Sequence, residues 1–515
     1  MDPTLPEELR RSDRLMQVLR KPGFKPDICG TAPTQRLHAG KPAEENIGRF
    51  IPHKKPRKLD RWLDCVVQMS GSEIVFFTLL AGLAAWALLG VKYGHTDIWQ
   101  VMISDIQAIL SYVFDTFLVR QQLNGYDEEM LAVAQIESRM ISHSRMLTLG
   151  SEGIEKSGLQ LSIQRETTDA LEYEAELPRE NRFGHFVTTC SLVLGHLSTV
   201  VLYWAGVIVW IGIGHLEGYS SSWLLYMNSA SSALMVFIFA FLANIRERHS
   251  AYTRKCLNAI FLVDSALEVK LRSLTGDTLA NDVVIIPAPK VNRIQRVIFY
   301  YADVIGTLVG IVLLFVVLAI WVAIGPALEF SDNWWLISGT YAGLIGMNDG
   351  FVLRNLQNCL GGAVNSRFAE LSDKDERLFE LTGLPHPEKE QPTNISLTAR
   401  ISEIVNRVSG HELAVVVGFL AILGLIAGSS AMKWNTTGQL LSNVPPSLIE
   451  SFFMLILITG HNSADGRKRV NLRNIYERRL RLLLYINDVQ AQRDAPRKIS
   501  VELTEVDVSF QVTAS

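Results

Sequence analysis

Eight long apolar runs constrain this sequence more than any other feature. Each is about 20 residues long or longer, the length that an α-helix needs to cross the hydrocarbon core of a bilayer. The runs are Glu73–Tyr93, Ile98–Gln122, Phe186–Ile213, Trp223–Ile245, Val297–Ile324, Trp334–Arg354, Glu412–Ala431 and Pro446–Asp465. They form pairs, because the links after the first, third, fifth and seventh runs are short. The sequence therefore predicts an all-α polytopic membrane protein with about eight transmembrane helices, arranged as four helical-hairpin repeats.

The second run of each pair shares a polar layout near its end. An acid or amide precedes a basic residue by five positions, in the pairs Asp115 and Arg120, Asn244 and His249, Asp349 and Arg354, and Asn462 and Arg467. Such self-similarity indicates an internal repeat. A carboxylate held within hydrocarbon costs about 2.5–3.5 kcal/mol on insertion scales, so one that is kept usually lines a polar path.

The paired runs divide the chain into membrane and extramembrane segments. We place the hairpins at residues 71–122, 186–249, 297–354 and 411–467, the segments between them at 123–185, 250–296 and 355–410, and the terminal segments at 1–70 and 468–515. Asp127–Ser142 and Ala251–Leu271 carry Leu, Ile and Val at helical spacing among charged residues, which predicts cytosolic helical extensions. Met1–Arg61 is rich in Pro, Lys and Arg without a sustained period, so we expect a partly disordered tail. We predict linkers at Gly153–Arg182 and Phe379–Asn394 and a loose tail at Asp494–Ser515.

Basic residues predict the orientation of the spans. They cluster at residues 54–58, 246–255, 290–296 and 467–473, whereas the short links hold almost none apart from Lys92 and Lys433 at their margins. By the positive-inside rule, both termini and all long segments lie in the cytosol.

Composition narrows the classes of partner and activity. A net charge of -3 argues against nucleic acid, because phosphate binding needs a concentrated basic surface. The five cysteines are scattered without a CxxC pair, so we expect free or buried thiols. No Walker motif is present, which argues against an ATP-driven pump. We expect no enzyme activity and no permanently bound cofactor.

Polar side chains gather on one face of the second helix in each pair, at about 100° per residue. The predicted metal ligands are Asp105, Asp115, Asp349, Glu450, His461 and Asp465. The predicted path-lining or supporting residues are Asn228, Asn244, Tyr341, Asn348, Met454 and Asn462. Carboxylates with an imidazole and neutral oxygens suit borderline divalent ions such as Fe²⁺, Mn²⁺ and Zn²⁺. A transported ion must leave again, so we expect weak sequential sites rather than a closed cage.

Each candidate also has a purely structural interpretation. Asp115 and Asp349 can pair with Arg120 and Arg354 and hold the hairpins in register. The alternatives for the other residues are packing for His461 and Met454, hydration at the interface for Glu450, an electrostatic funnel for Asp105, and interhelical hydrogen bonds for Asn244 and Asn462. For Arg120, Arg354 and Arg467 we expect snorkelling to the cytosolic headgroups.

Several strings resemble one protein family. They are KPGFKPDICGTAPT at Lys21–Thr34, SYVFDTFLVRQQL at Ser111–Leu123, ANIRERH at Ala243–His249, DNWW at Asp332–Trp335, DGFVLR at Asp349–Arg354, and a TTGQL string followed by HN-AD in the last quarter. In this order along most of the chain, they are similar to the fungal low-affinity iron permeases. The resemblance implies a plasma-membrane transporter that imports Fe²⁺ with low affinity, with spillover to Cu, Zn and other divalent ions.

The driving force follows from membrane physics. An inside-negative potential favours entry of a divalent ion by roughly 4.6 kcal/mol per 100 mV, so uniport needs no coupling ion. The alternatives are a proton-coupled or channel-like divalent cation transporter, a membrane ferrireductase, and a non-transporting scaffold. Haem-carrying helices need paired intramembrane histidines, and His185, His196, His215 and His461 do not give two facing pairs at a common depth. A homodimer is plausible for so compact a set of helices.

Overall fold

The computed structural model describes residues 23–35, 49–50, 55, 57–154, 177, 182–380, 382–384 and 397–494. These residues are almost entirely helical, which confirms the all-α class. Two three-residue strands, β1 (Ile28–Gly30) and β2 (Val284–Ile286), pair antiparallel with Cys29 opposite Ile285. The predicted tail Asp494–Ser515, apart from Asp494 itself, and most of the predicted linkers Gly153–Arg182 and Phe379–Asn394 lie outside the described residues.

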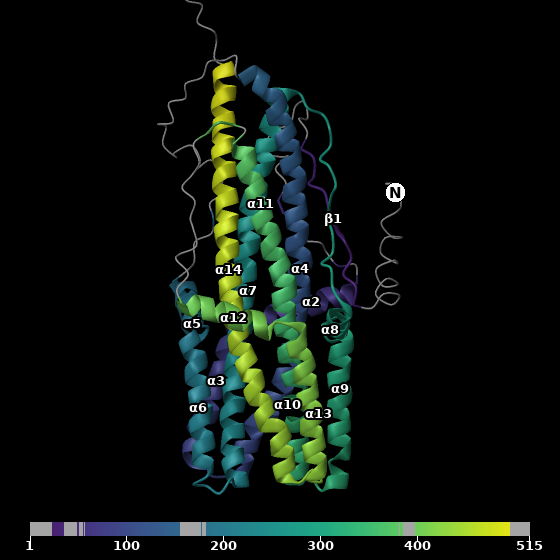
Figure 1. Ribbon diagram of the computed structural model, residues 1–515, viewed down its shortest axis with the longest axis vertical. Coiled ribbons are helices and arrows are strands. Elements are labelled where there is room, and N and C mark those ends of the chain that lie inside the picture. Colours follow the sequence, from purple (N-terminus) through teal and green to yellow (C-terminus); the bar gives the residue numbers. More distant parts are fainter. Residues whose placement is uncertain are drawn as a thin grey trace, which may run out of the picture.

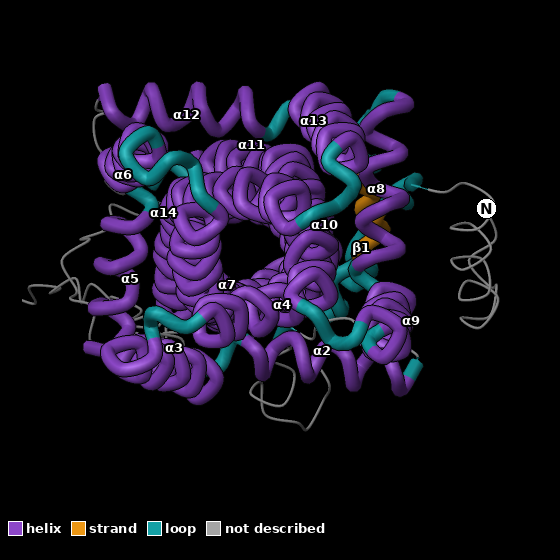
Figure 2. Tube along the Cα trace, turned by 90° about the horizontal axis from the view of Figure 1, so that it is seen from below, coloured by secondary structure: helices purple, strands orange, loops and turns teal. Residues whose placement is uncertain are grey.

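Apart from α11, the α-helices of the described residues fall into three sets (Figures 1 and 2). The inner helices are α4 (Asp97–Ile154), α7 (Ser221–Thr275), α10 (Asp332–Leu356) and α14 (Thr436–Asp494). The outer helices are α3 (Glu73–Tyr93), α6 (Leu197–Gly214), α9 (Leu308–Ile324) and α13 (Glu412–Ala431). The collar helices, each 13 residues long, are α2 (Lys58–Ser70), α5 (Arg182–Leu194), α8 (Arg293–Ile305) and α12 (Leu397–Ser409). A π-helical turn, η5 (Gln357–Gly361), joins α10 to α11 (Gly362–Glu380), and a 3₁₀ turn, η4 (Pro326–Leu328), follows α9.

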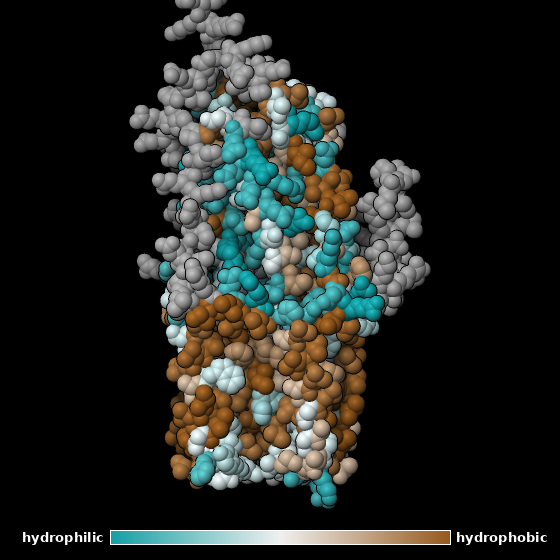
Figure 3. All heavy atoms as spheres, in the orientation of Figure 1, coloured by the Kyte–Doolittle hydropathy of each residue, from teal (hydrophilic) through white to brown (hydrophobic). Residues whose placement is uncertain are grey.

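On the face drawn in Figure 3, apolar side chains cover one half of the molecule, and most of the hydrophilic side chains lie on the other half. Among the described residues, α3, α4, α6, α7, α13 and α14 are long and apolar enough to cross a membrane. The bent pair α8 and α9 makes a seventh candidate span. Helix α10 lies in the same layer as these helices (Figure 1) but is not among the candidates.

Two of the predicted runs are not continuous helices. Phe186–Ile213 divides into α5 and α6 around Gly195, and Val297–Ile324 divides into α8 and α9 with a bend of 69°. The residue after the glycine caps the new helix in each case, because the side chain of His196 accepts from the backbone N–H of Ser198 and that of Thr307 from Val309. A side chain that satisfies a free N–H at a helix start favours ending one helix and beginning another. Each of these two predicted runs therefore combines a collar helix with an outer helix.

The collar helices lie at the edge of the apolar band and form four sides around the bundle (Figure 2). They expose apolar side chains to the outside: Leu59, Trp62 and Met69 on α2, Phe186 and Leu192 on α5, Ile294 and Val297 on α8, and Ile404 and Val408 on α12. An amphipathic helix with such an exposed face lies in the membrane interface, with its apolar side toward the acyl chains. The collar therefore marks one surface of the membrane.

The inner helices surround a common axis in the order α4, α7, α14, α10 (Figure 2). Each outer helix packs against an inner helix that does not follow it directly in sequence: α3 against α7, α6 against α14, α13 against α10, and α9 against α4. The outer helices thus link neighbouring inner helices around the ring.

Side chains of the inner helices bind the backbone at the breaks between collar and outer helices. Asn244 Nδ2 donates to the carbonyl of Gly71 over 3.0 Å, Asn462 Nδ2 to Ser191 over 2.9 Å, Arg120 Nη1 to Gly306 over 3.1 Å, and Asn355 Nδ2 to Gly410 over 3.1 Å. A helix end buried in protein needs such partners, because its last carbonyls have no bond within the helix. A side-chain donor binds a backbone carbonyl at all four breaks. Each donor comes from the inner helix that lies next in the ring after the one that follows the break in sequence.

Replacing Gly71 with alanine is expected to destabilise the protein by about 1–3 kcal/mol, the usual cost of overpacking. A Cβ at this position would lie 2.6 Å from Glu247 Cβ and 2.7 Å from the carbonyl oxygen of Ala243 on α7. Gly82→Ala is the matched control, because a Cβ at Gly82 meets nothing within 4 Å. Thermal unfolding of the two purified variants should give a lower midpoint for Gly71→Ala alone; equal midpoints would contradict tight packing at the break.

Beyond the collar, α4, α7, α11 and α14 continue as the extramembrane bundle (Figure 1). Its interior holds a network of ion pairs with almost no solvent exposure. Arg139 and Arg272 pair with Glu268 at 3.0 and 2.9 Å, and Arg478 and Arg479 pair with Asp375 at 2.7 and 2.5 Å. The predicted helical extensions are therefore present, and they form one packed unit.

Part of the predicted N-terminal tail is structured. Strand β1 packs against α4, where a Cβ at Gly30 would lie 2.6 Å from Ala134 Cβ. The backbone N–H of Gln35 donates to Glu268 Oε1 over 3.1 Å, and Lys25 pairs with Asp303 at 2.7 Å. These contacts come from distant parts of the chain, so local periodicity in the tail carries no sign of them.

Candidate metal path

Three carboxylates lie in the interior of the inner helices. Asp115 on α4, Asp349 on α10 and Glu450 on α14 are at most 1% exposed, and their charges are close enough to repel one another. We call these residues the carboxylate cluster. A concentration of buried negative charge of this kind attracts cations.

The carboxylates of this cluster differ in their partners. Tyr301 on α8 donates its hydroxyl to Asp349 Oδ1 over 2.5 Å, and Asn348 also hydrogen-bonds this carboxylate. No described residue donates a hydrogen bond to either oxygen of Asp115 or Glu450. A buried carboxylate without a partner is costly to keep charged, so these two groups require a bound cation or a proton.

Helix α10 makes room for the cluster with a stripe of glycines. Gly339, Gly343, Gly346 and Gly350 recur at spacings of four, three and four residues, which places them on one helix face. That face lies against α14: a Cβ at Gly346 would overlap the Glu450 carboxylate, and one at Gly343 would lie 3.2 Å from Asn443 Oδ1. This spacing is visible in the sequence and is a signal from which the close approach of α14 could have been predicted.

Neutral polar side chains occupy the interior on the side of the cluster away from the collar. Gln107 Nε2 donates to Ser111 Oγ over 2.5 Å, and Ser232 Oγ to Gln107 Oε1 over 3.4 Å. Asn228 is fully buried, and neither polar atom of its amide has a hydrogen-bond partner among the described residues. Amide and hydroxyl groups of this kind can replace part of the hydration shell of a cation.

Two predicted residues lie between helices in this half of the membrane layer. Asp105 is part of the contact between α4 and α10, where Ser338 Oγ donates to Asp105 Oδ1 over 2.5 Å. Tyr341 is half-buried, with its ring stacked at 6.5 Å from that of Tyr112. These contacts place both side chains beside the cluster rather than within it.

Histidines meet on the collar side of the cluster. Nδ1 of His249 on α7 lies 2.9 Å from Nε2 of His461 on α14, and the two rings stack at 4.8 Å. Asp465 Oδ2 lies 3.5 Å from the same nitrogen of His249 and 2.5 Å from Arg469 Nε. The sequence argument about paired histidines did not include His249. The structure gives one facing pair in the described residues.

The predicted arginine roles need correction for two of three residues. Arg120 is buried and pairs with Asp64 at 2.6 Å, while Arg354 is buried and donates to Ser409 Oγ over 3.1 Å and to the carbonyl of Asn406 over 2.6 Å. Both guanidinium groups bind the collar helices instead of snorkelling to headgroups or pairing with the carboxylates five residues earlier. These partners lie on the collar helices. The prediction missed them because apolar runs alone do not distinguish collar helices from membrane spans. Arg467 is exposed.

The remaining predicted residues have structural contacts. Asn244 and Asn462 bind the backbone at helix breaks, as their structural alternative proposed. Met454 is fully buried in the main apolar core.

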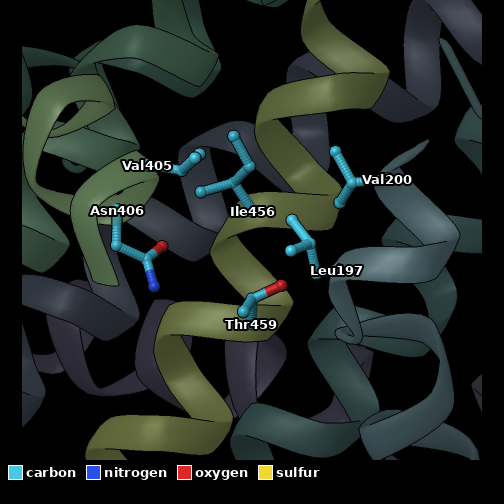
Figure 4. Close-up of a pocket in the computed structure, with 6 residues that line it drawn as sticks. All are labelled: Leu197, Val200, Val405, Asn406, Ile456 and Thr459. Atoms are coloured by element: carbon cyan, nitrogen blue, oxygen red, sulfur yellow. The ribbon is translucent and has the colours of Figure 1, made fainter. Parts of the chain in front are cut away.

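Within the described residues, no group of three His, Cys, Asp or Glu side chains is close enough to hold a metal ion. The carboxylate cluster and the histidine pair therefore lie at separate positions and do not form one preformed metal-binding site. A small pocket between α6, α12 and α14 is lined by Leu197, Val200, Val405, Asn406, Ile456 and Thr459 (Figure 4). Its lining is mostly apolar and carries no charged side chain, so it does not supply ligands for a cation.

Comparison with known proteins gives a consistent result. Residues 398–509 match the family model described as low affinity iron permease. The chain is 32% identical to the low-affinity iron/zinc ion transport protein fet4 of Schizosaccharomyces pombe, over 94% of this chain and 87% of that protein. It is 34% identical to the low-affinity Fe(2+) transport protein of Saccharomyces cerevisiae, over 83% of each chain. No solved structure matches the chain. By their names both relatives are transport proteins and not enzymes, which agrees with the prediction from the sequence.

Proposed function

This chain belongs to the low-affinity iron permease family of multi-pass membrane proteins, and from that premise we propose that it carries Fe²⁺ across the plasma membrane into the cytosol. The names of its relatives support Fe²⁺ and Zn²⁺ as transported ions. Cu and Mn remain further candidates on chemical grounds, because carboxylate and imidazole donors accept several borderline divalent ions.

The observation that carries the proposal is the carboxylate cluster. Asp115 and Glu450 are buried in the membrane layer without hydrogen-bond donors among the described residues, and Asp349 lies close enough to repel both. Carboxylates are placed so deep within a membrane protein at a large cost, which a passing cation offsets. We infer a path that runs between the inner helices, with Asn228 on one side of the cluster and the pair His249 and His461 on the other.

We propose eight spans in four hairpin repeats, with α10 as the eighth. Stacked tryptophans support the repeat: Trp86 with Trp99, Trp210 with Trp223, and Trp321 with Trp334 each join an outer helix to the following inner helix, with ring centroids 3.9–4.4 Å apart. All three pairs are 13 residues apart in sequence. The positive-inside rule supports a cytosolic location for the collar, the extramembrane bundle and both termini.

The test is uptake of radiolabelled Fe²⁺ by purified protein in liposomes with an inside-negative potential. We expect uptake above that of protein-free liposomes, and a rate for Asp115→Asn reduced about tenfold or more, which corresponds to ~1.4 kcal/mol or more at the barrier. Asp373→Asn, at an exposed position on α11, is the control for loss of a carboxylate. Uptake no faster than in protein-free liposomes would overturn the proposal, and unchanged uptake by Asp115→Asn would favour a scaffold role for the cluster.

Proton-coupled transport is the second candidate, favoured by the same unpaired carboxylates. In the absence of a metal ion, Asp115 and Glu450 are cheaper to bury with a proton than with a charge. Measuring uptake against a pH gradient at clamped voltage separates the mechanisms, because only proton coupling makes metal entry follow the gradient.

A further inference from the structure

Four buried apolar side chains, one on each inner helix, fall on the collar side of the carboxylate cluster. They are Leu118 on α4, Leu242 on α7, Leu353 on α10 and Met454 on α14, each at most 1% exposed. Each comes from a different inner helix, and all four are part of the large apolar core that continues into the extramembrane bundle. We call them the apolar ring.

Helix spacing sets the level of the ring. Each member follows by three or four residues a position at the level of the carboxylates, namely Asp115, Phe239, Gly350 and Glu450. Contacts between helices support this level: a Cβ at Gly350 would lie 3.9 Å from Glu450 Cα, and Phe239 stacks at 5.8 Å on Phe114, next to Asp115. A step of three or four residues returns to the same helix face about one turn away. The ring therefore lies one turn beyond the carboxylates.

Polar contacts resume one further turn toward the collar. Arg246 on α7 donates to Gln122 Oε1 on α4 over 2.5 Å, and Gln357 Nε2 donates to the carbonyl of Leu457 on α14 over 3.0 Å. His249 and His461 follow at the next level. The apolar ring thus separates the carboxylate cluster from the polar groups through which an ion would leave.

A ring of this kind is a barrier to hydrated ions. An apolar constriction excludes water, so a cation crosses only if it sheds much of its hydration shell. Mg²⁺ gives up water reluctantly and prefers oxygen ligands in octahedral geometry. Among the four side chains, only Met454 has an atom with lone pairs, and a thioether is a ligand for softer metal ions.

We propose that the apolar ring is the selectivity barrier of this transporter and that the Met454 sulfur is a transient ligand for transition-metal ions that cross it. The inference rests on the proposed transport of Fe²⁺ and adds a residue that discriminates against Mg²⁺ and Ca²⁺. The carboxylate cluster attracts any divalent cation, whereas the ring passes only those that a sulfur atom stabilises.

Two variants test the two parts of the proposal in liposomes. Met454→Leu keeps the size and apolar character of the side chain but removes the sulfur, so Fe²⁺ uptake should fall about tenfold while Mg²⁺ stays excluded. Leu353→Ala shortens one side chain of the ring, so Mg²⁺ and Ca²⁺ should enter at a rate at least about tenfold above wild type.

Leu336→Ala is the matched control for the truncation. Leu336 is also buried on α10, but it belongs to a separate apolar cluster with Leu440 and Val444. This variant should exclude Mg²⁺ as wild type does, and thermal unfolding of all variants reports whether they are folded. A leak through Leu336→Ala equal to that through Leu353→Ala would overturn the barrier, since the leak would then follow from loosened packing.

The results also distinguish failure of this inference from failure of the proposed function. Wild-type protein that takes up no Fe²⁺ contradicts the transport function itself, and the Mg²⁺ leak of Leu353→Ala is measured without iron. Wild-type protein that takes up Fe²⁺, together with Met454→Leu at the wild-type rate, overturns the role of the sulfur. Unchanged exclusion of Mg²⁺ by a folded Leu353→Ala overturns the barrier.

Discussion

Replacing Glu450 with glutamine is expected to lower the rate of Fe²⁺ uptake about 10- to 100-fold and at the same time to raise thermal stability. Glu450 is fully buried, and none of the described residues donates a hydrogen bond to its carboxylate. The amide keeps the shape and removes a charge that is costly to bury, so the folded state gains. The same change removes a ligand that a cation would use at the barrier, where each factor of ten corresponds to about 1.4 kcal/mol.

The measurement combines initial uptake rates in liposomes with thermal unfolding in detergent. Glu73→Gln, at an exposed position at the start of α3, is the control and should leave both quantities unchanged. Opposite changes in rate and stability distinguish a functional carboxylate from a structural one, since loss of a structural ion pair lowers stability. Wild-type uptake by Glu450→Gln would remove this residue from the path.

The largest effect on stability is expected from Asp375→Ala in the extramembrane bundle. The carboxylate of Asp375 pairs with both Arg478 and Arg479, and all three residues are buried. Removing it leaves two guanidinium groups without their shared partner in the interior. Breaking a buried ion pair in this way typically costs about 3–5 kcal/mol.

Asp373→Ala supplies a close control on the same helix, two residues away. Asp373 is exposed, so its loss should change stability by less than about 0.5 kcal/mol. Chemical denaturation of the two purified variants, followed by circular dichroism, measures the difference. Equal midpoints would mean that water or other side chains replace Asp375, and that the network does not hold the bundle together.

Local patterns predicted the membrane helices well, because the signal for a span is carried by neighbours in sequence. The apolar run Glu73–Tyr93 matches α3, and Glu412–Ala431 matches α13, residue for residue. The breaks at Gly195 and Gly306 were not predicted. A glycine followed by a residue that can cap a helix is common in sequences, and it ends a helix here because a side chain from a neighbouring helix binds the backbone at the break. That neighbour is distant in sequence: Asn462 binds the carbonyl of Ser191, and Arg120 that of Gly306.

The sequence predicted the acidic residues of the candidate path but not the side chains that contact them. Asp115, Asp349 and Glu450 stand out in sequence because charge is rare in apolar runs. Tyr301 lies on the collar helix α8, which the apolar pattern does not separate from the outer helix α9. The hydrogen bond from Tyr301 to Asp349 was therefore not predicted. The alternative in which Asp349 pairs with Arg354 is wrong, because five residues of helix turn the two side chains about 140° apart. Arg354 instead binds Ser409 and Asn406 on α12.

The sequence by itself determined that this chain crosses a membrane several times and carries acids inside it, because burial of about 20 apolar residues in lipid depends on each segment alone. The tertiary structure decided which helices surround the axis and which side chains close the helix breaks. These outcomes depend on the order of the inner helices around the ring, α4, α7, α14 and α10, which no local pattern encodes. Contacts between segments hundreds of residues apart arise only when the helices pack together.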